Sequence, residues 1–184
     1  MQLPKIFDSI SSFRQEEGLP QFDSLSQYIE YIVPSIRPFG EDLYETENYV
    51  GASWLEFSDD ETDEAYKKTV VHYFNEGREY MRSVNGDITR GSWELKEGEN
   101  RIVLDTRQRG TELYDLTFLH PYFFILRKHG TREYFVLGRE QKTRSLTWRE
   151  YAEALDQVYE NNNTVLIIVT VLVFMIVALF FLLR

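Results

Sequence analysis

The apolar positions of this chain recur with different periods in successive segments. Near the N-terminus, the segment DSLSQYIEYIVPSI has apolar residues at helical spacing from Leu25 to Val33. Asp23 or Ser24 stands where a helix N-cap is expected, and Pro34 is expected to end the helix. The pattern therefore predicts one amphipathic helix that packs on a globular neighbour.

From about residue 49 to residue 139 the period changes to two. Turn signals recur at a regular interval, in the order FNEGRE, VNGD, KEGEN, RQRGT, LHPY and KHGT. Short runs separated by turns at this spacing predict an antiparallel meander. The expected strands are 50–57, 67–74, 78–84, 88–96, 100–106, 111–118, 122–128 and 132–139.

Eight short strands joined by hairpins can close on themselves, which removes the unpaired edges of an open sheet. We therefore predict a mainly β fold, in which eight antiparallel strands form a small up-and-down barrel. Alternation along the strands predicts which side chains share a face. These are Trp93 with Leu95, Ile102 with Leu104, and Tyr114 with Leu116 and Phe118.

A barrel of eight strands is just wide enough to be filled by its own side chains or to hold one small molecule. Aromatic residues make up 15% of the chain, and this content favours a filled interior. A ligand pocket remains the alternative. The aromatic residues expected in the interior are Trp54, Tyr80, Trp93, Tyr114, Phe124 and Tyr134.

The run from VVHYFNEGREYM to YFVLGRE resembles the bacterial lipocalin-like domains. Gly91, Ser92 and Trp93 supply a G-x-W strand, Tyr114 and Leu116 the next element, and Arg139 a closing arginine. The opening motif of that family is here GASW, residues 51–54, which is one residue longer. The resemblance implies an eight-stranded barrel that holds a small apolar ligand, in a family whose familiar members are exported lipoproteins.

After the barrel, the segment LTWREYAEALDQVYENNN predicts a second amphipathic helix. Thr147 and Glu150 form a capping box, and apolar residues recur at helical spacing from Trp148 to Tyr159. This stripe needs a partner, which is the barrel wall, another protomer or the membrane surface. Three consecutive asparagines, 161–163, predict a break after the helix.

The most apolar segment runs from Thr164 to Leu183 and carries no charge. At about 1.5 Å per residue it reaches roughly 30 Å, the thickness of the hydrocarbon core of a bilayer. Because the first residues show no secretory signal, we expect a tail-anchored, single-pass membrane protein with its N-terminal domain in the cytoplasm. The expected parts are an N-terminal helical segment (1–48), the lipocalin-like barrel (49–140), an amphipathic helix with linker (141–163) and a transmembrane helix (164–183).

The charge of the chain is uneven. The net charge of −10 argues against general nucleic-acid binding. Residues 1–64 hold 3 basic and 15 acidic side chains, whereas residues 101–149 hold 10 basic and 5 acidic ones. The later segment is therefore either a solvated face or a surface that binds anions or lipid. The expected ligand-binding residues are Arg127, Lys128, Arg132, Tyr114 and Trp93.

Catalytic and metal-binding motifs are sparse. His72, His120 and His129 are scattered, the chain has no cysteine, and no serine stands in a G-x-S-x-G context. The acidic run SDDETDEA lacks the spacing and the glycine of an EF-hand. We therefore expect that the protein is not an enzyme and that it binds no metal ion and no cofactor.

Two classes of function remain. We favour a membrane-tethered interaction module, a subunit or adaptor of a membrane complex on the cytosolic face, with a protein partner or a second copy of the chain. The alternative is a sensor whose barrel binds an anionic or nucleotide-like small molecule and controls assembly of the transmembrane segments. A small molecule retained after gentle extraction from the membrane would discriminate between them.

Overall fold

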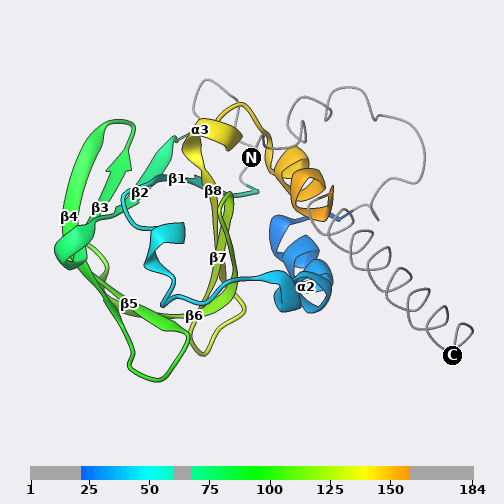
Figure 1. Cartoon of the computed structure of the whole chain (residues 1–184). Coiled ribbons are helices and arrows are strands. Elements are labelled where there is room, and N and C mark those ends of the chain that lie inside the picture. Colours follow the sequence, from blue (N-terminus) through cyan, green and yellow to red (C-terminus); the bar gives the residue numbers. More distant parts are fainter. Residues whose placement is uncertain (1–21, 60–67, 158–184) are drawn as a thin grey trace, which may run out of the picture.

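The computed structural model describes residues 22–59 and 68–157, and within them eight strands form a closed antiparallel barrel (Figure 1). Each strand pairs with the next in sequence, and β8 closes the barrel by pairing with β1, with Trp54 opposite Arg139. The predicted mainly β barrel is confirmed. The strands are β1 (Ser53–Phe57), β2 (Val70–Phe74), β3 (Glu79–Val84), β4 (Asp87–Leu95), β5 (Arg101–Thr106), β6 (Gly110–His120), β7 (Phe123–Lys128) and β8 (Tyr134–Arg139).

The glycine of the G-x-W segment has a steric role in the sheet. Gly91 pairs with Thr106 across β4 and β5, and a Cβ atom added to it would lie 2.0 Å from the carbonyl oxygen of Asp105. That separation is far inside van der Waals contact with backbone, so no side chain fits here. The glycine therefore permits the close approach of β5 to β4.

A bulge in β6 changes the faces that alternation predicts. The register with β7 shifts between Leu116 and Phe118. Tyr114 and Leu116 face the barrel interior, whereas Phe118 belongs to the outer apolar cluster. The expected common face of these three residues is therefore wrong, because the extra residue of a bulge reverses the alternation that follows it.

Two helices cover one outer side of the barrel. α2 (Leu25–Ile36) lies beside the helical residues 148–157, and both pack on the outer faces of β1, β7 and β8 (Figure 1). The hydroxyl of Tyr28 donates to the carbonyl of Ala152 at 2.6 Å, which joins the two helices. The described part of the predicted stripe, from Trp148 to Leu155, therefore has the barrel wall as its partner, and the rest of the stripe lies outside the described residues. A short helix, α3 (Glu140–Thr143), connects β8 to it.

The two predicted caps are present, but one predicted helix end is wrong. Ser24 accepts a hydrogen bond from the backbone N–H of Gln27, and the backbone N–H of Thr147 donates to Glu150 at 2.7 Å. Pro34 does not end α2, which continues to Ile36. The buried face of the helix extends past the proline, because Ile36 packs in the same outer cluster.

The segment between α2 and β1 crosses one end of the barrel (Figure 1). Leu43 and Tyr49 from this segment are fully buried in the interior cluster. The backbone N–H of Glu41 donates to the carbonyl of Leu119, and that of Leu43 donates to the side chain of Asn100. This end of the barrel is therefore plugged by the chain itself. The 3-10 turns are η1 (Arg37–Phe39) and η2 (Thr46–Asn48) in this segment and η4 (Glu76–Arg78) between β2 and β3.

The predicted transmembrane helix, residues 164–183, lies outside the described residues. Among residues 22–59 and 68–157, no helix combines the length and the apolar character that a membrane crossing requires.

Candidate functional site

The interior of the barrel has an apolar half and a polar half. The apolar half lies at the plugged end and is filled mostly by aromatic side chains. Its members include Leu43, Tyr49, Trp54, Phe74, Trp93, Leu119 and Phe124. The polar half consists of interior side chains from β1, β2, β3, β6 and β7, namely Glu56, His72, Tyr80, Arg82, Glu112, Tyr114 and Lys128.

Strand alternation places these polar side chains inside. Glu56 follows the interior residue Trp54 by two positions, and His72 precedes Phe74 by two. In the register of β2 with β3, His72 lies opposite Arg82. Cross-strand partners share one face of a sheet, so Arg82 lies on the interior face as well.

The first polar chain joins Glu56, His72 and Tyr80. The Nε2 atom of His72 lies 2.8 Å from Oε2 of Glu56, and its Nδ1 atom lies 2.6 Å from the hydroxyl of Tyr80. An ionised carboxylate only accepts, so Nε2 carries the proton and Nδ1 accepts from Tyr80. This arrangement fixes one tautomer of a neutral imidazole.

The charges around the hydrogen-bonded residues Glu56, His72 and Tyr80 favour a neutral His72. Burial lowers the pKa of His72, and the nearby Arg82 and Arg109 lower it further. Burial acts to raise the pKa of Glu56, but the hydrogen bond to His72 and the charge of Arg82 hold it below its ordinary value. At neutral pH the pair is therefore a carboxylate beside a neutral histidine.

The second polar chain joins Lys128, Glu112 and Tyr114. The ammonium of Lys128 donates to Oε1 of Glu112 at 2.9 Å, and the hydroxyl of Tyr114 donates to Oε2 at 3.0 Å. Burial acts to raise the pKa of Glu112, but these two donors hold it below its ordinary value. Both oxygens of this carboxylate are therefore engaged.

Arg82 is the least satisfied member of the polar half. Its Nη2 atom lies 3.9 Å from Oε2 of Glu56, the oxygen that also binds His72. Its Nε atom is buried and has no hydrogen-bond partner among the described residues. The side chain is 17% exposed, so it lies largely inside the barrel with donor capacity to spare.

Arg109 adds positive charge to the same region. It belongs to the turn between β5 and β6, where its backbone N–H donates to the hydroxyl of Thr106 at 3.1 Å. Its charge lowers the pKa of Glu56 and of His72, among others in the polar half. The side chain of Arg109 therefore stands close enough to act on a charged molecule bound there.

Aromatic rings border the polar half. The ring of Phe135 meets His72 edge-on, with 4.7 Å between centroids, and Tyr114 lies against Phe135 at 5.6 Å. These contacts limit the motion of the imidazole and of the tyrosine ring. The polar groups are thus held on rigid strands by packed neighbours, which suits a preorganised binding site.

The residues that the sequence suggested for ligand binding do not form one group. Tyr114 and Lys128 belong to the polar half, whereas Trp93 lies in the apolar half and donates to the carbonyl of Asn75 at 3.0 Å. Arg132 is exposed between β7 and β8. Arg127 lies on the outer face of β7. Their joint role in binding remains a prediction.

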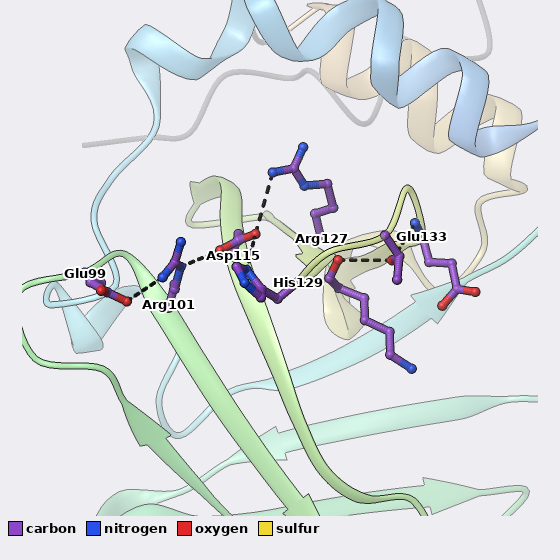
Figure 2. A network of polar contacts seen from close by, with 8 residues as sticks. Glu99, Arg101, Asp115, Arg127, His129 and Glu133 are labelled. Atoms are coloured by element: carbon purple, nitrogen blue, oxygen red, sulfur yellow. Dashed lines mark hydrogen bonds and ion pairs between the residues drawn. The ribbon is translucent and has the colours of Figure 1, made fainter.

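Figure 2 shows a network of ion pairs around Asp115, which includes Arg127, one of the residues suggested for ligand binding. Arg101, Arg127 and His129 converge on the carboxylate of Asp115 on the outer face, at 2.6, 3.6 and 3.1 Å. Burial acts to raise the pKa of Asp115, but hydrogen bonds from Arg101 and His129 hold it below its ordinary value. This cluster is a half-exposed ion-pair network, a kind that contributes little to stability.

Sequence reasoning missed Glu56, Arg82 and Glu112 as site residues, and it treated His72 as an isolated histidine. The available signal was alternation applied to polar residues rather than to apolar ones. Tyr134 was expected inside, but it packs on the outer cluster, and Phe135 takes the interior position. Phe135 faces the interior because, in the pairing of β8 with β7, it lies opposite the interior residue Leu126.

A comparison of the chain with protein families, curated proteins and solved structures finds no match. The closed barrel of eight antiparallel strands is consistent with the lipocalin-like fold. Among the residues that the structure describes, no group of three or more metal-ligating side chains is present.

Proposed function

We propose that the protein is a small-molecule binding module whose barrel takes a ligand in its polar half. In this proposal residues 164–183 tether the barrel to a membrane, with the barrel on the cytosolic side. The observation that carries the proposal is the Nε atom of Arg82, a buried donor without a hydrogen-bond partner among the described residues.

A buried donor without a partner is rare, because leaving it unpaired costs about 1 to 3 kcal/mol. No neighbouring polar group of the described residues accepts from this atom. Both oxygens of Glu112 are engaged by Lys128 and Tyr114, and Glu56 approaches Arg82 only at Nη2, at 3.9 Å. A bound molecule with an acceptor atom would complete the site. An ordered water would also satisfy the donor, and a change of stability on addition of a ligand separates ligand binding from hydration.

The interaction-module alternative has less support from the described residues. The apolar stripe that begins at Trp148 is the predicted surface that a protein partner could cover. The described part of that stripe, from Trp148 to Leu155, is buried on the barrel wall together with α2. The described apolar surfaces therefore do not call for a second protein, and we place ligand binding first.

Thermal denaturation of the full-length chain in detergent tests the proposal. A panel of carboxylates, nucleotides, second messengers and fatty acids would be screened for compounds that raise the melting temperature. Ligand binding raises it by mass action, by an amount that grows with concentration over Kd. We expect Arg82→Met to abolish the shift and Arg127→Met, on the outer face, to retain it. A panel without any shift, or equal loss in both variants, would count against the proposal.

A further inference from the structure

The depth of the polar half limits how a ligand can enter. Trp54, Phe74 and Phe124 fill the interior beyond it, and each is completely buried. Leu43 and Tyr49 close the same end. These side chains prevent a ligand from entering deeper than the polar groups. The part of the ligand that contacts Arg82 is therefore the end that enters the barrel first.

The charges of the polar half favour an anion at that leading end. Arg82, Arg109 and Lys128 carry positive charge there, against the two carboxylates of Glu56 and Glu112. Because His72 is neutral, three cations face two carboxylates, and the net charge of the polar half is positive. Arg82 shares the carboxylate of Glu56 with His72 and keeps a buried Nε–H without a partner among the described residues, so it is the donor that an anion would meet. A guanidinium pairs best with planar carboxylate or with phosphate-type oxygens, through two parallel hydrogen bonds.

The hydrogen-bond chain next to Arg82 can respond to such an anion. While His72 is neutral, the hydroxyl of Tyr80 donates to its Nδ1 atom. When His72 takes a proton, Nδ1 becomes a donor, and the hydroxyl of Tyr80 must accept instead. Its own O–H is then free to turn toward a group bound on Arg82.

Building on the proposed function, we propose that the polar half binds the carboxylate or phosphate-type group of a small molecule head-first on Arg82, together with a proton on His72. The anion and the proton then stabilise each other. Tyr80 couples them, because its hydroxyl becomes available to the anion only when His72 is protonated.

The surroundings of His72 give the direction of the coupling. The charged and titratable groups that act on it are Glu56 from β1, Arg82 and Tyr80 from β3, and Arg109 from the turn after β5. Arg82 and Arg109 oppose protonation, and Glu56 favours it. An anion on Arg82 offsets the opposing charge, so anion binding should draw in a proton and lower pH should tighten binding.

Titration calorimetry with the full-length chain tests this coupling. Benzoate represents carboxylates and sulfate represents phosphate-type anions, and neither changes its charge between about pH 6 and pH 8, where histidine titrates. We expect the affinity for at least one probe to rise as pH falls, by no more than about tenfold per pH unit, the limit for one proton. Comparing buffers with different ionisation heats should show uptake of up to one proton per anion.

Variants separate the parts of the inference. Arg82→Met should abolish binding of the probe, and His72→Gln should leave binding that no longer depends on pH. Binding without pH dependence or proton uptake in the wild-type chain would overturn the coupling but not the proposed function. Binding that survives Arg82→Met would overturn the placement of the anion. If neither probe binds at any pH, the inference about the anion is wrong. The proposed function would still stand if a compound in the thermal screen raises the melting temperature.

Discussion

The hydroxyl of Tyr80 lies 2.6 Å from Nδ1 of His72, and both side chains are buried inside the barrel. The two residues are diagonal neighbours on β2 and β3, since Tyr80 pairs with Phe74 and His72 pairs with Arg82. The contact is therefore set by the strand register. It links a buried tyrosine to a buried histidine that also binds Glu56.

Tyr80→Phe should test the energy of that contact. Removing the hydroxyl leaves Nδ1 of His72 buried without its donor, which should lower the free energy of unfolding by about 1 to 3 kcal/mol. Tyr31→Phe is the matched control, because Tyr31 is 56% exposed and its change should stay within about 0.5 kcal/mol. Chemical denaturation of the full-length chain measures both, and equal small effects would mean that the Tyr80 bond is not formed.

Trp93 and Glu94 test the register of β4. Trp93 is buried in the apolar half, whereas the side chain of Glu94 is 64% exposed and pairs loosely with Arg78 at 3.4 Å. Trp93→Ala should cost about 3 to 5 kcal/mol through lost burial and the cavity left behind. Glu94→Ala should change the unfolding free energy by no more than about 0.5 kcal/mol. Comparable losses at both positions would contradict the register.

Gly91→Ala tests the close approach of β4 and β5. The new methyl group would meet the carbonyl oxygen of Asp105 at 2.0 Å, so the two strands must separate. We expect a loss of stability of at least about 1 to 3 kcal/mol, the range of overpacked sites. Ser92→Ala is the control, because Ser92 is exposed on the same strand. A Gly91→Ala variant as stable as the control would mean that the strands lie farther apart.

The strands were predictable from the sequence because their turns are explicit in it. At the VNGD turn, Asn85 and Gly86 both adopt positive φ, the conformation that an Asn-Gly hairpin needs. The bulge in β6 was not predictable in the same way. Apolar side chains occupy Leu116, Phe118 and Leu119, so the pattern fits either register.

The polar half was harder to predict because β1 is buried on both faces. Leu55 and Phe57 point to the helices, while Trp54 and Glu56 point to the interior. With apolar residues on both faces, alternation alone does not say which face is inside. Glu56 is identified as an interior residue by its position two residues after the buried Trp54 and by its hydrogen bond to His72 on the next strand.

Stability should fall as pH is lowered through the range in which histidine titrates. Burial lowers the pKa of His120 from 6.5 to about 4. Between those values the unfolded chain takes up a proton that the folded chain does not bind, so the unfolding free energy falls by up to about 1.4 kcal/mol per pH unit. His72 contributes in the same direction, because its pKa is also lowered. Denaturation of the wild-type chain and of His120→Gln checks this, and equal slopes for both would contradict it.

Protease accessibility tests the expected membrane placement. If residues 164–183 anchor a cytosolic barrel, protease added to the cytosolic side of intact membrane compartments should digest residues 1–160. Digestion after detergent treatment is the control, because it shows whether the protease can cut residues 1–160 at all. Protection that detergent removes would place the barrel on the other side of the membrane.

The central claim is that Arg82 holds a buried donor for an anionic ligand, and its Nε–H group can be observed directly by nuclear magnetic resonance. Arg101 is the internal control, because its Nε–H already donates to Asp115 at 2.6 Å on the outer face. During titration of the full-length chain with benzoate or sulfate, we expect the Arg82 signal to move downfield and to exchange more slowly with water. The Arg101 signal should stay in place. An Arg82 signal that does not move, or that moves no more than that of Arg101, would contradict the claim.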